Sequence, residues 1–250
     1  MNTAALHTPL AQQRVGGLVR ERPLRGRVFD SLGIDYCCGG NRTLAAACAA
    51  ADVPLVTAIG LLGQSDSEAS EAVECDWSTA YLAALVDHII EKHHAYLQDE
   101  LPRLASLIRR VVAAHAGRHP ELIELSQVFS ALASELTAHM LKEEHVLFPA
   151  IKRLEQHRGE PCTLVSPGGG LDQPIAVMED EHRSVGQALR RIHWLTADYH
   201  VPPDACNAYR SMLAGLERLE TDLHLHIHKE NNILFPRACR LSAEPAPSQT

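Results

Sequence analysis

The sequence predicts an all-α protein, in which a small helical domain precedes an up-down-up-down four-helix bundle. Hydrophobic residues make up 46% of the 250 residues, yet aromatic residues make up only 4%, a balance that favours helices over sheets. Helical periodicity dominates from Ser78 onward and is interrupted in three places, which leaves four long segments. A chain of this length can form one large core and a small additional domain.

The charge balance and the cysteine pattern exclude several classes of protein. The formal net charge is −8 and no run of Lys and Arg is present, so we expect no nucleic-acid partner. We expect a cytoplasmic protein without a membrane partner, because the chain shows neither a signal sequence nor 18 consecutive apolar residues. The seven cysteines form no CxxC pair, which argues against a zinc ribbon and favours reduced thiols.

The first predicted domain covers residues 1–64. Its centre is the turn-like segment DYCCGGNR, and Thr43 can cap the short helix that follows this segment. Residues 65–77 are rich in Ser, Glu and Asp, so they are predicted to be a linker.

The bundle is predicted over residues 78–240, followed by a flexible tail at 241–250. Short links between consecutive helices favour the up-down-up-down order, with the loop that contains SPGGG as the longest connection. Pro102 is expected to kink the first helix without ending it. The predicted helices are 78–115, 119–157, 174–199 and 203–240.

Two segments of the second and fourth helices repeat the same pattern. ELTAHMLKEEHVLFP and DLHLHIHKENNILFP share an acidic residue, His and Glu at intervals of four, and then Leu-Phe-Pro. At about 100° per residue, His139 and Glu143 project from one helix face, as do His226 and Glu230. Each pair could supply two ligands to a metal ion from one face of a helix. The same spacing turns Glu144 and His228 away, so both are expected to face solvent.

The first and third helices each offer a single histidine, His88 in LVDHII and His182 in VMEDEH. A lone histidine among apolar residues is more often a hydrogen-bonded core residue than a ligand. Two such histidines joined to two His-x3-Glu pairs, one contribution from each helix, favour a metal site instead. Four imidazoles and two carboxylates exceed the needs of one tetrahedral zinc, so two ions are implied, with iron favoured over manganese and the glutamates able to bridge.

Five motifs together resemble one family: DYCCGG, VDHII, SELTAHMLKEE, MEDEH and HKENNILFPRA are similar to the repair of iron centres (RIC) family of hemerythrin-like di-iron proteins. The resemblance covers about residues 17–240. It implies two non-haem iron ions with carboxylate and oxo bridges. It also implies that the iron ligands are His88, His139, Glu143, His182, His226 and Glu230.

The resemblance implies a stress-response protein that helps repair iron-sulfur clusters damaged by NO or oxidants. It would act by donating iron, by processing NO, or by both, with damaged iron-sulfur proteins as clients and NO or O₂ as small ligands. The sequence departs from oxygen-carrying hemerythrins, with Gly186 in place of a second His of an HxxxH pair and Glu230 in place of a later aspartate. These differences argue against reversible oxygen carriage.

Further residues are candidates for supporting roles. Glu135 and Asp222 each precede a ligand histidine by four residues, and Glu181 precedes His182, so these carboxylates could orient an imidazole or line a path for iron and protons. The alternative is a solvated carboxylate at the end of the bundle.

Cys37 and Cys38 precede two glycines that allow a sharp turn and would expose a thiol near a helix start. A purely structural role is the alternative. The resemblance marks this CCGG motif as the small N-terminal domain of the family. The hypothesis that follows is that the two thiols supply electrons or pass iron.

Two alternative functions stay open. One is a sensor or scavenger that binds NO or O₂ without turnover, and whether the protein is an NO-reducing enzyme is therefore undecided. The other is a ferritin-like oxidase, because Glu91-x2-His94 and Glu179-x2-His182 imitate the ligand pattern of that class. The oxidase hypothesis leaves the repeated His-x3-Glu pairs unexplained. The client, the electron donor and the oligomeric state, including a homodimer, are not determined by the sequence.

Overall fold

A computed structural model describes residues 9–68, 76–156 and 170–243 of the chain. Across these ranges the regular structure is helical, and the only bridge of β type is an isolated antiparallel one between Arg14 and Thr43. The predicted all-α class is therefore confirmed. The chain divides into two compact units, Met1–Ala80 with Ile227–Ile233, and Tyr81–His226 with Leu234–Thr250.

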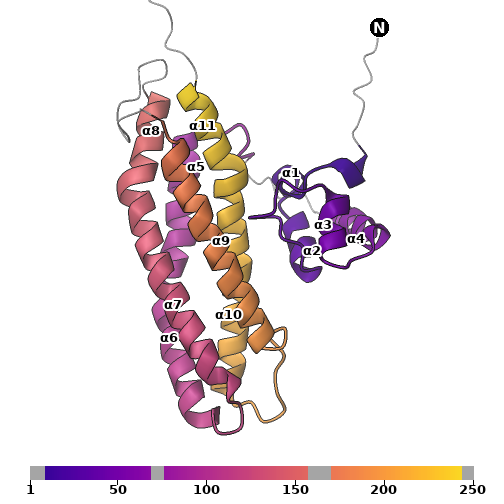
Figure 1. Cartoon of the computed structure of the whole chain (residues 1–250), viewed down its shortest axis with the longest axis vertical. Coiled ribbons are helices and arrows are strands. Elements are labelled where there is room, and N and C mark those ends of the chain that lie inside the picture. Colours follow the sequence, from indigo (N-terminus) through magenta and orange to yellow (C-terminus); the bar gives the residue numbers. More distant parts are fainter. Residues whose placement is uncertain (1–8, 69–75, 157–169, 244–250) are drawn as a thin grey trace, which may run out of the picture. The chain divides into compact units, whose positions relative to one another are not determined.

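The long helices lie side by side in the part of the chain after Tyr81 (Figure 1). Helix α7 packs against α6 and α9, while α8 packs against α5 and α11. The predicted bundle is therefore present. In chain order, its four rows are α5 (Leu82–His88), η2 (Ile89–His94) and α6 (Ala95–His115); α7 (Glu121–Lys142), η3 (Glu143–Leu147) and α8 (Phe148–Gln156); α9 (Asp172–Leu195); and α10 (Asn207–Lys229), η4 (Glu230–Leu234) and α11 (Phe235–Ala243).

Apolar side chains at helical spacing form the core of the bundle. In α6, Leu97, Leu101 and Leu104 are buried in successive turns, which is the pattern of a helix with one face against a core. Helix α10 approaches α6 closely at Gly215, where an added Cβ would lie 2.7 Å from a methyl carbon of Leu104. The helix also continues through Pro102, as the sequence predicts.

Three of the four rows contain a π-helical segment. Segments η3 and η4 begin at Glu143 and Glu230, which occupy the same position in the two copies of the repeat, and η2 ends at His94. A π-helical segment inserts extra chain into a helical turn and is frequent at functional sites. The π segments therefore mark one level of the bundle in three different rows.

The first unit contains η1 (Leu10–Gln12), α1 (Val15–Glu21), α2 (Arg25–Ser31), α3 (Leu44–Ala50) and α4 (Leu55–Glu68). Phe29, Tyr36 and Leu44 are among the side chains that fill its core. The Thr43 side chain accepts a hydrogen bond from the backbone N–H of Ala46 and caps α3, as expected.

Helix α4 extends to Glu68, so it includes the start of the segment predicted as a linker. Three predicted features lie largely outside the described residues: the rest of that linker, the SPGGG loop and the C-terminal tail. Their boundaries stay predictions.

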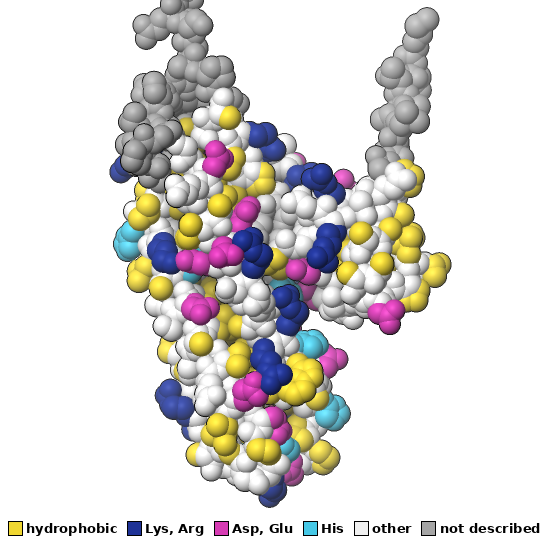
Figure 2. All heavy atoms as spheres, viewed as in Figure 1, with side chains coloured by type: hydrophobic (Ala, Val, Ile, Leu, Met, Phe, Trp, Pro, Cys, Tyr) yellow, Lys and Arg dark blue, Asp and Glu magenta, His cyan; other side chains and the backbone are white. Residues whose placement is uncertain are grey.

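The surface of the long helices carries charges of both signs. Figure 2 shows acidic and basic side chains close together on the visible face of the long helices. Between α9 and α7, Arg191 pairs with Glu124. Within the described ranges, no single helix is long and apolar enough to cross a membrane, although the bent pair of α3 and α4 passes such a test by length and composition.

An ion pair between α2 and α4 is expected to stabilise the first unit. Arg25 is nearly buried and donates from Nε and Nη2 to the two carboxylate oxygens of Asp66, at 3.0 and 2.7 Å. We expect Arg25→Met to lower the local free energy of unfolding by about 2 kcal/mol, the size of a charged hydrogen bond. Hydrogen exchange of the α4 amides measures this loss. Arg22→Met is the control, because Arg22 is half exposed and lies 3.5 Å from Asp66.

The Arg25–Asp66 pair is expected to make the stability of the first unit depend on pH. Hydrogen bonding from Arg25 lowers the pKa of Asp66 below its ordinary 3.8 in the folded state. The stabilisation is therefore fully present above about pH 3.8 and is lost as the pH falls through the lower folded value. Equal α4 protection in wild type and Arg25→Met across this range would contradict the assignment.

Candidate metal centre

Histidine and glutamate side chains converge in two buried groups inside the bundle. In each group, one ligand atom from every residue lies within 4.8 Å of the others. The groups are His94, Glu143, His226 and Glu230, and His139, Glu143, His182 and Glu230. Because both groups contain Glu143 and Glu230, the six residues form one centre with two shared carboxylates.

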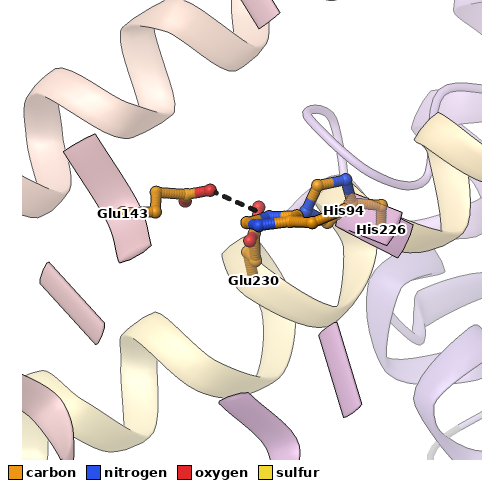
Figure 3. A group of neighbouring side chains, drawn as sticks. All are labelled: His94, Glu143, His226 and Glu230. Carbon is orange, nitrogen blue, oxygen red and sulfur yellow. Dashed lines mark ion pairs between the residues drawn. The ribbon is translucent and has the colours of Figure 1, made fainter. Parts of the chain in front are cut away.

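Figure 3 shows the first group, with its four side chains pointing toward one another from three rows of the bundle. Nε2 of His94 lies 3.4 Å from Oε2 of Glu143. In the second group, Nε2 of His139 lies 3.4 Å from the same carboxylate oxygen. One oxygen of Glu143 therefore faces a histidine of each group.

The donor set fits a metal centre. Glu143 and Glu230 are both at 0% exposure, and burying two carboxylates is costly unless cations or strong donors compensate them. Nε2 of His182 lies 3.0 Å from Nε2 of His139. Two nitrogens bound at right angles to one ion at about 2.1 Å would be about 3.0 Å apart, so this spacing suits two ligands of a single metal.

Carboxylates behind two of the histidines determine which ring nitrogen faces the centre. Nδ1 of His94 lies 2.8 Å from a carboxylate oxygen of Glu144, and Nδ1 of His139 lies 2.8 Å from one of Glu181. An ionised carboxylate only accepts hydrogen bonds, so each Nδ1 is the donor. The lone pair of each Nε2 is then directed into the centre, which is the tautomer that a metal requires.

Glu181 is held in its ionised form. Partial burial opposes ionisation, but hydrogen bonds from Lys142 and His139 outweigh burial and lower the pKa of this carboxyl below its ordinary 4.5. These contacts support the proposed role of Glu181 as a residue that orients His139.

His88, a ligand in the sequence prediction, belongs to neither group. It is half-buried, and its ring lies edge-on to His93 with centroids 5.8 Å apart. His94, which is 0% exposed, takes its place. The π segment η2 begins directly after His88 and ends at His94, so the angular position expected from α-helical spacing does not apply to His94. We therefore replace His88 by His94 in the proposed ligand set.

The remaining candidate carboxylates lie farther from the centre. Oδ1 of Asp222 is 2.9 Å from Nδ1 of His93, whose ring stacks on that of His226 with centroids 5.2 Å apart. Asp222 thus reaches a proposed ligand only through a second imidazole. Glu135 is exposed on α7.

Two side chains expected to face solvent are buried or bonded inside the protein. Glu144 contacts His94 as described, and His228 is only 3% exposed. Within the first unit, the His228 ring lies 5.6 Å from that of Tyr36, and burial lowers the pKa of His228 to about 3. Both expectations were wrong because helical spacing identifies a face of one helix but not what packs against its other faces.

Cys37 and Cys38 lie in the first unit and are not joined by a disulfide; their sulfur atoms are 3.9 Å apart. Cys37 is buried and Cys38 is half-buried. The hydrogen bond with Cys38 and burial together raise the pKa of Cys37 well above its ordinary value. Cys37 is therefore a protonated thiol at neutral pH unless a cation displaces the proton.

The fold and the donor set together define a helical bundle with a buried cation-binding centre. A family model described as the hemerythrin HHE cation binding domain matches residues 85–238, and the chain belongs to this family. A second model, described as a domain of unknown function (DUF542), matches residues 11–62.

Relatives match nearly the whole chain. Proteins named iron-sulfur cluster repair protein YtfE, from Citrobacter koseri, Salmonella paratyphi B and Salmonella newport, are each 36% identical over 226 residues. The matches cover 90% of this chain and 96% of each relative. The resemblance to the RIC family, drawn from five short motifs, is thereby confirmed.

Proposed function

We propose that the centre binds two iron ions bridged by Glu143 and Glu230. His94 and His226 would hold one ion, and His139 and His182 the other. The observation that supports this proposal best is that the same two glutamates belong to both groups. Mixed imidazole and carboxylate donors in the core of a helical bundle are typical of di-iron proteins. When bound, such iron supplies one-electron chemistry and affinity for NO or O₂.

We further propose that the protein helps to repair iron-sulfur clusters damaged by nitrosative or oxidative stress. The name of the relatives supports this role, since they match over nearly their whole length. Two histidines and two shared glutamates would leave an octahedral ion with open positions. An incompletely ligated iron suits both iron donation to a damaged client and the processing of NO.

The residues around the centre have separable tasks in this function. The six ligands are 3% exposed or less, so the centre is shielded from bulk water. Glu144 and Glu181 keep a proton on Nδ1 of His94 and His139, which leaves each Nε2 available to a metal. Lys142 balances the charge of Glu181.

A matched pair of variants tests both the ligand set and the function. His94→Ala should lower the iron content from two ions per chain to one or fewer, because the first group loses one of its two imidazoles. His88→Ala should keep two ions, since His88 lies outside both groups. Metal analysis after anaerobic iron loading measures both. Loss of iron in His88→Ala with full retention in His94→Ala would overturn the assignment.

The same proteins test repair. An NO-damaged iron-sulfur enzyme should regain activity with wild type and with His88→Ala, and recover much less with His94→Ala. If the client does not recover with fully loaded wild type, the repair function is wrong even though the metal assignment stands. Stoichiometric retention of NO without client recovery would favour the alternative of a binding protein.

The ferritin-like oxidase has little support from the geometry. Glu91 is exposed on η2, whereas His94 is buried, so these two residues do not act together as an inward Glu-x2-His pair. The repeated His-x3-Glu pairs supply both shared carboxylates instead.

A further inference from the structure

We propose that Asp35, Cys37 and Cys38 form a second metal site, in the first unit, for a single thiophilic divalent cation such as Zn²⁺ or Fe²⁺. One ligand atom from each of the three residues lies within 4.8 Å of the others. The two sulfurs and the carboxylate are donors typical of tetrahedral sites for borderline-soft metals. This site shares no residue with the centre in the bundle.

Two of the three spacings between the donor atoms match the edges of a coordination tetrahedron, and the third is within 4.8 Å. With metal–sulfur bonds of about 2.3 Å and a metal–oxygen bond of about 2.0 Å, the sulfurs should lie about 3.8 Å apart, and sulfur and oxygen about 3.5 Å apart. The Sγ atoms of Cys37 and Cys38 are 3.9 Å apart, and Sγ of Cys37 is 3.4 Å from Oδ1 of Asp35. Little rearrangement is therefore needed to accept an ion.

The backbone holds the carboxylate in position. Oδ1 of Asp35 accepts hydrogen bonds from the N–H groups of Cys38 and Gly39, at 2.9 and 3.0 Å. Bonds of this kind orient a ligand before a metal arrives. They also tie the carboxylate to the segment that contains both thiols.

The two glycines make room for this turn. A Cβ on Gly39 would lie 2.6 Å from the carbonyl oxygen of Asp35, and one on Gly40 would lie 2.7 Å from that of Tyr36. Because these contacts are with backbone atoms, any side chain would force the turn open. The DYCCGG motif thus encodes both the three donors and the backbone that gathers them.

The charge balance defines the binding reaction. A divalent cation replaces the thiol protons of Cys37 and Cys38, and two protons leave to solvent as two metal–sulfur bonds form. The Asp35 carboxylate supplies a third negative charge. Three protein donors would leave the fourth position of a tetrahedron to be filled by water or by a thiolate from another molecule. An open position makes the ion exchangeable.

Co²⁺ binding to the reduced full chain, with the bundle centre already loaded with iron, tests the proposal. We expect one equivalent of Co²⁺ to produce sulfur-to-cobalt charge-transfer absorption and Zn²⁺ to abolish this absorption. The double variant C37S/C38S should lose it. Asp35→Asn keeps an oxygen acceptor for the backbone but loses the charge, so it should weaken Co²⁺ binding by roughly tenfold or more.

Controls separate this site from the rest of the molecule. Cys206→Ser removes an exposed thiol elsewhere and should leave the absorption unchanged. Unchanged circular dichroism and iron content would show that the Cys37 and Cys38 variants are folded. Thiolate absorption that persists in C37S/C38S, or that never appears in wild type, would overturn the site. Neither result depends on whether the protein repairs clusters.

Discussion

Replacing Glu143 by alanine is expected to remove both metal ions from the bundle, although it changes a single residue. Glu143 belongs to both groups, and its Oε2 lies 3.4 Å from Nε2 of His94 and of His139. Each group would keep only one carboxylate, Glu230, to balance a divalent or trivalent cation. We expect the iron content to fall from two per chain to well below one, as measured by metal analysis after dialysis.

Glu135, in the same row of the bundle as Glu143, offers a control for this variant. Glu135→Ala removes an exposed carboxylate from the same row of the bundle and should leave two ions bound. The helical content of Glu143→Ala should stay at the wild-type level well below the melting temperature, because apolar packing holds the helices together there without metal. If Glu143→Ala retained one tightly bound ion, the two ions would not share this carboxylate.

Removing the metal with a chelator is expected to lower the stability of the bundle substantially. The chain without metal must bury two carboxylates and four imidazoles at a single level of the core. A ligand present at a thousandfold excess over its dissociation constant stabilises the folded state by about 4 kcal/mol. For a domain of this size, that energy corresponds to a fall in Tm of about 10 °C, which calorimetry can measure.

A double variant makes the stability test specific to the centre. Glu143→Leu with Glu230→Leu replaces both buried carboxylates by apolar side chains of similar size. Its Tm should be the same with and without metal, and should exceed that of the wild-type chain without metal. A Tm shift on chelation as large as in wild type would mean that the stabilising metal lies elsewhere.

Most of the fold could be predicted from the sequence because helical periodicity and helix breaks are local properties. The repeat around His139 and His226 showed which face of two helices turns inward, and the structure gathers both histidines and their paired glutamates. Thr43 could be identified as a helix cap for the same reason, since capping depends on residues only three positions apart.

The sequence favours His88 in the first helix, whereas the structure groups His94 with the two shared glutamates. Helical periodicity predicts one α-helix over 78–115, and within it favours His88, a histidine in the largely apolar segment LVDHII. The π segment η2 changes the number of residues per turn and brings His94 to the centre instead. The segment EKHH contains His94 as a second candidate ligand, but only the ferritin-like hypothesis used this residue.

Helical periodicity could not predict contacts between different helices or within turns. Glu144 lies outside the His-x3-Glu pair, yet it contacts His94 from another row. The three-residue group in DYCCGG depends on backbone N–H groups that fold back onto Asp35. Such long-range or backbone-mediated contacts are fixed by packing and turn geometry, not by the period of a helix.

The pairing of Lys142 with Glu181 makes the two halves of the bundle centre chemically unequal. Each half has two imidazoles and shares the same glutamates, so their inner donors are alike. Behind His139, however, the carboxylate is neutralised by a lysine, whereas Glu144 stands behind His94. A neutralised carboxylate pushes less electron density into its imidazole, and His139 is the weaker donor of the two. In the proposed di-iron centre, two chemically different positions would allow one ion to be released while the other stays bound.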